Sequence, residues 1–131
     1  MREEVKAWLR LAGDDLKLAE IAYKEGIYHL ACFHAQQCVE KSMKALFYFR
    51  DEVPPKTHSI AKLVNMLQGY HPFSDTEPLL KFDLYYIPTR YPDTLPGAFP
   101  EGLPSKEDAE EAINSAREVF HSVLDYIKSG K

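Results

Sequence analysis

The chain has 131 residues, enough for one domain that closes a single hydrophobic core without metal or disulfide support. Hydrophobic residues make up 45% and charged residues 27% of it, a balance that is typical of a soluble globular protein and excludes a disordered one. The formal net charge of −4 excludes a broad basic surface, so any contact with RNA or a nucleotide has to be local. Apolar runs are short and the chain opens on an amphipathic helical pattern, so we expect a cytoplasmic protein without a signal peptide or membrane span.

The first helix is predicted from Arg2 to Glu25 and ends at Gly26. Its apolar residues recur at intervals of three and four, which a helix turns into one stripe: Val5, Trp8, Leu9, Ala12, Leu16, Ala19 and Tyr23. The short turn that follows predicts an antiparallel hairpin with the next helix. Gly13 lies inside this helix, where glycine costs about 1 kcal/mol relative to alanine, and we expect it to permit the close approach of a neighbour.

The central helix is predicted from Tyr28 to Phe49, a run without glycine or proline. One face of it is small or apolar and predicts burial within a bundle: Tyr28, Ala31, Cys32, Ala35, Cys38, Val39, Ser42, Ala45, Leu46 and Phe49. The adjoining stripe mixes aromatic rings with amide and charged groups: Phe33, Gln36, Gln37, Glu40, Lys44 and Phe47. Two phenylalanines beside a core face would form an exposed patch, so this stripe predicts a second contact, either in a homodimer or with a ligand.

The two cysteines, Cys32 and Cys38, both fall on the central helix. They are separated by about 9 Å along the helix axis and cannot bridge each other. We expect them to be buried structural thiols in a reducing cytoplasm, because a metal site needs more nitrogen or sulfur ligands at close spacing.

Two short helices and a proline-rich loop are predicted after Pro54 and Pro55, which stop the central helix. The first short helix follows the cap candidates at 57–59 and ends near Gly69, and the second follows those at 74–76 and runs through Ile87. Prolines at 88, 92, 96, 100 and 104 then exclude regular helix.

The loop from 88 to 104 allows two interpretations. It could be fastened onto the bundle by its three large apolar residues, Leu95, Phe99 and Leu103, or it could be a polyproline recognition segment, and we favour the first. Ser105 and Asp108 then predict a capped last helix. Its inward stripe is predicted to be Ala109, Ala112, Ile113, Ala116, Phe120, Val123, Leu124 and Ile127.

The pattern as a whole predicts an all-α fold with no strand. We expect a single domain, residues 1–131, folded as an up-and-down bundle of about five helices, three long and two short, with a long proline-rich loop before the last helix.

No motif for a metal, a cofactor or a catalytic nucleophile is present, and the five histidines are dispersed. Glu40 and Lys44 form an i,i+4 pair that is either a solvated surface pair or part of a ligand site. Arg90 and Tyr91 lie in the proline-rich loop, where the guanidinium could bind a phosphate or instead tie the loop to Asp93 or Glu40.

Four stretches of the chain together resemble the HEPN domain family. They are A-W-L-R-L-A-G-D-D-L-K-L-A, then Y-H-L-A-C-F-H-A-Q-Q-C-V-E-K-S-M-K-A-L, then P-P-K-T-H-S-I-A-K-L, and finally Y-Y-I-P-T-R-Y-P-D. The central F-x-x-Q-Q-x-x-E-K-x-x-K-A segment is the most specific part. The resemblance implies a helical bundle, commonly dimeric, whose small prokaryotic members are often encoded beside a minimal nucleotidyltransferase as a toxin–antitoxin pair.

Many HEPN toxins are metal-independent ribonucleases with an R-x(4–6)-H motif at a dimer cleft, and this chain departs from that motif. Seven residues separate Arg50 from His58, three separate Arg117 from His121, and Arg90 has no histidine at the required distance. We therefore expect a protein that is not an enzyme. A ribonuclease that cleaves RNA without metal, and a purely structural interaction module, are the alternatives.

The resemblance and the residues together predict a homodimer that binds a nucleotide such as ATP or GTP, a nucleotidyltransferase partner, or both. The predicted ligand-binding residues are Phe33, Gln37, Glu40, Lys44, Arg90 and Tyr91. Lys44 and Arg90 would contact phosphate, the rings of Phe33 and Tyr91 would stack, and Gln37 would orient the ligand.

Overall fold

The computed structural model describes residues 2–86 and 102–130, and these form an all-α bundle, as predicted. It consists of three long helices, one short helix and one short 3₁₀ helix: α1 (Glu3–Lys24), α2 (Tyr28–Phe49), α3 (Ile60–Met66), η1 (Glu77–Tyr85) and α4 (Lys106–Lys128). None of these described residues forms a strand, and none of their helices is long and apolar enough to cross a membrane.

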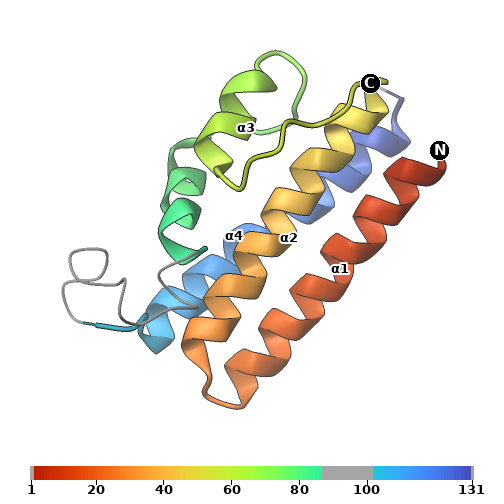
Figure 1. Ribbon diagram of the computed structural model, residues 1–131. Helices are drawn as coiled ribbons and strands as arrows, with labels where there is room; N and C mark the ends of the chain where they lie inside the picture. The colour runs from red at the N-terminus through yellow and green to blue at the C-terminus, as the bar shows by residue number, and fades with distance from the viewer. Residues whose placement is uncertain (1, 87–101, 131) are drawn as a thin grey trace.

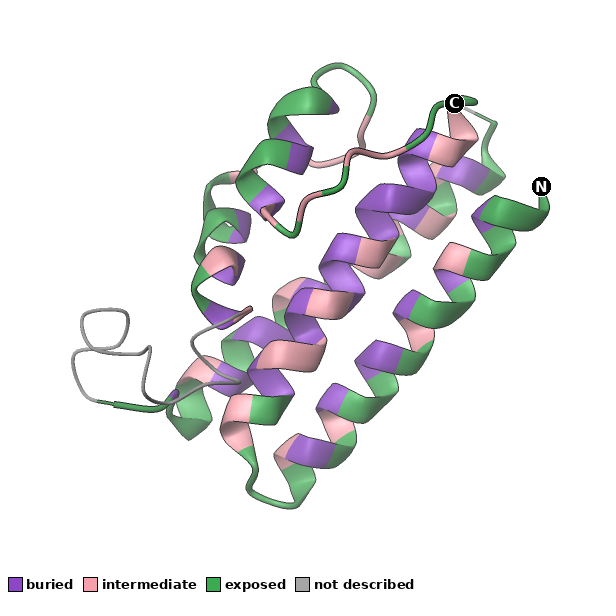
Figure 2. Ribbon diagram, viewed as in Figure 1, coloured by how far each residue is buried: buried purple, intermediate pink, exposed green. Residues whose placement is uncertain are grey.

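Helix α2 is the centre of the bundle and is purple or pink along most of its length in Figure 2. It packs against α1 and α4, while α3 and η1 cover another side of it (Figure 1). The predicted small face is buried from Ala31 to Leu46, where Ala31, Cys32, Ala35 and Cys38 all have 0% exposure, whereas Tyr28 and Phe49 at its two ends are half-buried. Burial raises the pKa of each thiol to about 12, so both cysteines are protonated structural groups, as predicted.

Two glycines shape the packing of α1, one in its turn into α2 and one at its contact with α4. Gly26 has a φ of +75°, a left-handed conformation that glycine adopts at low cost, and it lies in the turn between the helices. A Cβ atom built on Gly13 would lie 3.4 Å from Cζ of Phe120 in α4. The prediction that Gly13 permits a close approach is therefore confirmed, and the neighbour is α4.

The carboxylate of Asp83 connects the two short helices, α3 and η1. Ser59 caps α3 through its own hydroxyl. Asp83 of η1 accepts hydrogen bonds from the backbone N–H groups of Ile60 at 2.5 Å and Ala61 at 3.2 Å, and from the Ser59 hydroxyl at 3.1 Å. Because these donors are otherwise unpaired at a helix start, Asp83 fixes the segment before α3 relative to η1.

Helix α4 begins with the predicted capping box, in which Ser105 and Asp108 exchange side-chain and backbone hydrogen bonds. Leu103 was expected to pack onto the bundle, but it is 47% exposed, and Pro104 is the buried residue beside it. Most of the proline-rich loop lies outside the described residues. The second predicted short helix is a 3₁₀ helix, with Pro78 in its first turn.

Candidate functional site

The buried carboxylate of Glu40 is the centre of a polar cluster on α2. Its side chain is only 4% exposed, and Nζ of Lys44 lies 2.8 Å from Oε2. Gln36, itself fully buried, donates from Nε2 to Oε1 of Glu40 at 3.2 Å and to the backbone carbonyl of His58 at 3.2 Å. The negative charge is thus compensated on every side from within the chain.

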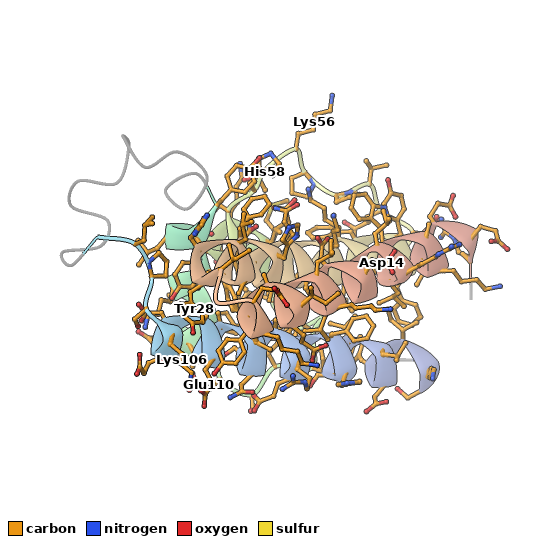
Figure 3. All side chains as sticks on the ribbon, turned by 90° about the horizontal axis from the view of Figure 1, so that it is seen from below. Asp14, Tyr28, Lys56, His58, Lys106 and Glu110 are labelled. Atoms are coloured by element: carbon orange, nitrogen blue, oxygen red, sulfur yellow. The ribbon has the colours of Figure 1, made fainter. Side chains whose placement is uncertain are left out.

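His58 completes this cluster from the segment before α3. Its Nδ1 lies 3.2 and 3.3 Å from the two carboxylate oxygens of Glu40, although the His58 side chain is 56% exposed. An ionised carboxylate only accepts hydrogen bonds, so Nδ1 carries the proton and Nε2 is the ring nitrogen directed away from Glu40. In Figure 3, His58 and Lys56 lie on the side of the bundle away from Lys106 and Glu110 of α4.

His58 and three further rings contact one another in succession. The His58 ring stacks on Tyr86 with a centroid distance of 4.2 Å and an interplanar angle of 13°. Tyr86 lies 6.0 Å from Phe33, and Phe33 lies edge-on to His34 at 5.2 Å. We call these four residues the ring row. It provides a partly exposed aromatic surface beside α2, on which a planar ligand could stack.

A second buried carboxylate lies at the other end of the ring row. Asp15 of α1 has a side chain that is 8% exposed, and its two oxygens lie 2.9 Å from His34 Nδ1 and 2.5 Å from Lys41 Nζ. Burial alone would raise the pKa of the Asp15 carboxyl, but the hydrogen bonds and charges of His34 and Lys41 outweigh it and hold the pKa below its ordinary value of 3.8. Asp15 is therefore ionised at neutral pH.

The structure brings four of the predicted site residues onto one side of α2. Phe33 and Gln37 are half-buried, and Gln37 donates from Nε2 to Oε1 of Gln36 at 2.7 Å. Glu40 and Lys44 are buried and paired, so the interpretation of this pair as a solvated surface pair is wrong. Arg90 and Tyr91 lie outside the described residues.

The expectation of an exposed phenylalanine patch is also corrected. Phe47 is only 2% exposed, so the described chain itself already covers this ring. The homodimer prediction therefore loses the argument that Phe47 needs a second subunit to cover it.

Sequence reasoning missed Asp15, His34 and Tyr86 and did not connect His58 with Glu40. Asp15 did carry a signal, since it interrupts the inward stripe of the first helix between Ala12 and Leu16. A charge at such a position needs buried partners, and His34 and Lys41 provide them. The contact between His58 and Glu40 depends on the path of the chain through Pro54 and Pro55, which spacing alone does not predict.

A groove with a volume of about 540 Å³ lies between α1 and α4. Most of its charged groups are already paired: Arg117 lies 2.6 Å from Glu20, and Tyr23 donates to Glu110 at 2.9 Å. Arg117 thus pairs with Glu20 of α1. Within 2–86 and 102–130, no group of three or more His, Cys, Asp or Glu residues could hold a metal ion.

Comparison with known families agrees with this architecture. A model of the HEPN domain matches residues 5–126, and the protein therefore belongs to the HEPN family. The sequence is 27% identical to a Methanocaldococcus jannaschii protein named "Putative toxin MJ1304", over 94% of this chain and 88% of that protein.

Two solved structures share the fold at 32% sequence identity. The crystal structure of TT1696 from Thermus thermophilus has a TM-score of 0.83 and matches 95% of this chain and 99% of its own. ST0689, described as an archaeal HEPN homologue, has a TM-score of 0.69 and matches 97% of this chain and 99% of its own.

Proposed function

We propose that this HEPN protein is of the toxin type and binds a nucleotide, without catalysis, on the side of α2 that carries Phe33, Gln37 and Glu40. The likeness to a relative named as a toxin supports the first part. The observation that carries the second is the His58 ring, which stacks on Tyr86 while the buried Glu40 carboxylate holds its Nδ1. A ring fixed on two sides presents Nε2 to a ligand at little cost in conformational entropy.

In this proposal, different residues stack on the nucleotide base and bind its phosphates. The base would stack beside Phe33 and Tyr86, and the amide of Gln37 would orient it. Lys44 would act indirectly, by compensating Glu40, because its side chain is only 11% exposed and already paired. Arg90 and Tyr91, which follow shortly after Tyr86, would add a phosphate contact and a further ring.

The test is a thermal shift assay with ATP and with GTP. A ligand at one hundred times its Kd stabilises a protein by about 2.7 kcal/mol, which raises the melting temperature of a domain of this size by several degrees. Tyr86→Ala should lose most of that rise, whereas Tyr126→Ala on α4 should keep it. No response to either nucleotide in the unmutated protein would overturn the proposal and leave an interaction module.

The toxin-type assignment also includes a partner. We propose that this partner is a minimal nucleotidyltransferase, as in the paired members of the family. We also propose that two copies of this chain form a homodimer. Coexpression with the neighbouring nucleotidyltransferase, where the genome encodes one, should yield a complex that survives gel filtration. Separate elution of the two proteins would contradict it.

A second copy would bind on the outer face of α1. Leu11 and Leu18 are each 47% exposed and Ile21 is 48% exposed, so this face carries exposed apolar side chains, with the exposed Asp14 among them. Figure 2 shows the exposed outer side of α1 in green. A twofold axis near the middle of α1 would place Leu11 of one copy against Leu18 of the other, which is the self-complementary arrangement of a symmetric dimer.

Metal-independent RNA cleavage is the second candidate function, and the contact between His58 and Glu40 is what favours it. A histidine oriented by a carboxylate is a common acid–base group. We nevertheless expect purified protein to leave single-stranded RNA and transfer RNA intact, because the R-x(4–6)-H spacing is missing. Cleavage that His58→Gln abolishes and His121→Gln does not would promote this candidate.

A further inference from the structure

The stack of His58 on Tyr86 joins two segments that lie outside the three long helices. His58 belongs to the non-helical segment before α3, and Tyr86 directly follows η1. The His58 side chain is exposed and Tyr86 is half-buried. One stacked pair of this kind contributes little free energy compared with the entropy that is lost when two chain segments are ordered. A further contact therefore has to hold the two segments in place.

Asp83 supplies that contact from within η1. Its half-buried carboxylate accepts hydrogen bonds from the backbone N–H groups of Ile60 and Ala61 and from the Ser59 hydroxyl, at 2.5, 3.2 and 3.1 Å. Hydrogen bonds to a carboxylate are stronger than those between neutral groups. The three donor residues follow His58 directly in the chain, so these bonds fix the backbone beside His58 relative to η1.

The geometry of η1 places Asp83 and Tyr86 on the same side. A 3₁₀ helix has three residues per turn, so side chains at positions i and i+3 lie one above the other. Asp83 and Tyr86 have this spacing at the end of η1. One side of η1 thus presents the carboxylate to the start of α3 and the phenol ring to His58, and α3 lies beside η1 (Figure 1).

We propose that Asp83 is the positioning residue of the His58–Tyr86 stack, because it fastens η1 to the start of α3. Glu40 holds the imidazole by its Nδ1, whereas Asp83 brings Tyr86 onto the face of that ring. The two carboxylates therefore act on different members of the stack. The inference concerns the protein without ligand, and it rests on the proposed function only where a nucleotide serves as a readout.

The test compares Asp83→Ala with Asp75→Ala in the full chain. Asp75 is the matched control, because its carboxylate also accepts from a backbone N–H at a helix start, that of Glu77 at 3.1 Å, but within one segment. In NMR spectra of the ligand-free protein, the nuclear Overhauser effect between the rings of His58 and Tyr86 should be lost in Asp83→Ala and kept in Asp75→Ala. Asp83→Asn retains one accepting oxygen and should keep part of the signal. A signal that persists in Asp83→Ala would overturn the inference.

A second readout separates positioning from general stability. Trp8 is the single tryptophan of the chain, and it stacks on Tyr48 of α2, so its fluorescence reports on the packing of the long helices. Asp83→Ala should keep the Trp8 emission and nearly all of the helix signal in circular dichroism, since α1, α2 and α4 pack on one another without Asp83. Loss of the whole fold in this variant would contradict the positioning role.

An ATP arm separates this inference from the proposed function. If ATP binds at the stack, the rise in melting temperature that it causes should be lost in Asp83→Ala and unchanged in Asp75→Ala. Loss of the ring-to-ring signal in Asp83→Ala, in a protein that never responds to ATP, would support this inference and contradict the proposed function. Persistence of that signal in Asp83→Ala contradicts this inference whatever the response to ATP.

Discussion

The His58 ring and the Glu40 carboxylate meet across two elements, with Nδ1 at 3.2 and 3.3 Å from the two oxygens. The carboxylate is buried in the bundle, while more than half of the imidazole is exposed. A contact of this kind fixes an exposed, titratable ring to the rigid core. The central α2 helix therefore has a structural face and, next to it, the face on which we propose nucleotide binding.

Glu40→Gln should lower the free energy of unfolding by about 3 kcal/mol, because it leaves the ammonium of Lys44 buried without its counter-charge. Glu111→Gln is the matched control. Its partner is Lys81, both side chains are well exposed, and the expected loss is about 0.5 kcal/mol or less. Urea denaturation of the two variants measures both values, and equal losses would contradict the structural role given to Glu40.

Because of Asp15, the free energy of unfolding should decrease as the pH is lowered. Its pKa is lower in the folded protein than the ordinary 3.8, so its contribution is complete above about pH 3.8 and is lost as the pH falls through the folded value. Asp15→Asn should therefore cost more stability at pH 7 than at pH 3. The check is the urea midpoint of both proteins at the two pH values, where a constant difference between them would refute the assignment.

Gly13→Ala should stabilise the fold by up to about 1 kcal/mol, since alanine favours a helix interior and the new Cβ would meet Phe120 at 3.4 Å, near ordinary contact. Gly13→Leu should destabilise it, because a larger side chain would push α1 and α4 apart. Thermal melting of the two variants should show a higher melting temperature for Gly13→Ala and a lower one for Gly13→Leu. Stabilisation by leucine would show that the helices are not in close contact there.

Self-association should depend on α1. Leu18→Glu should convert a dimer of about twice the chain mass into a monomer in light scattering, without loss of stability, because Leu18 is 47% exposed. Phe47→Glu should instead unfold the protein, since Phe47 is 2% exposed. A monomeric unmutated protein would remove the homodimer proposal altogether.

Local patterns predicted the bundle well. Helix α2 has the predicted bounds, and the cap at Ser105 and the close approach at Gly13 follow from residues near in sequence or from one small side chain. These features depend on helical periodicity and capping, which act over a few residues.

The site was harder to predict because it depends on contacts between elements. Periodicity placed Glu40 and Lys44 beside the core face but could not show that both side chains are buried in the folded chain. Likewise, the distance of 18 residues between Glu40 and His58 carries no signal without the path of the intervening prolines. A lone polar residue on an apolar stripe, as at Asp15, is the clue that sequence reasoning could have used.

The most direct test is a titration of ¹⁵N-histidine-labelled protein with ATP, followed by long-range ¹H–¹⁵N spectra of the imidazoles at neutral pH. The account predicts that His58 carries its proton on Nδ1 and that its Nε2 resonance moves as ATP is added, while His121 stays in place. Tyr86→Ala should suppress the movement. A His58 ring that is unaffected by saturating ATP would contradict nucleotide binding at this side of α2.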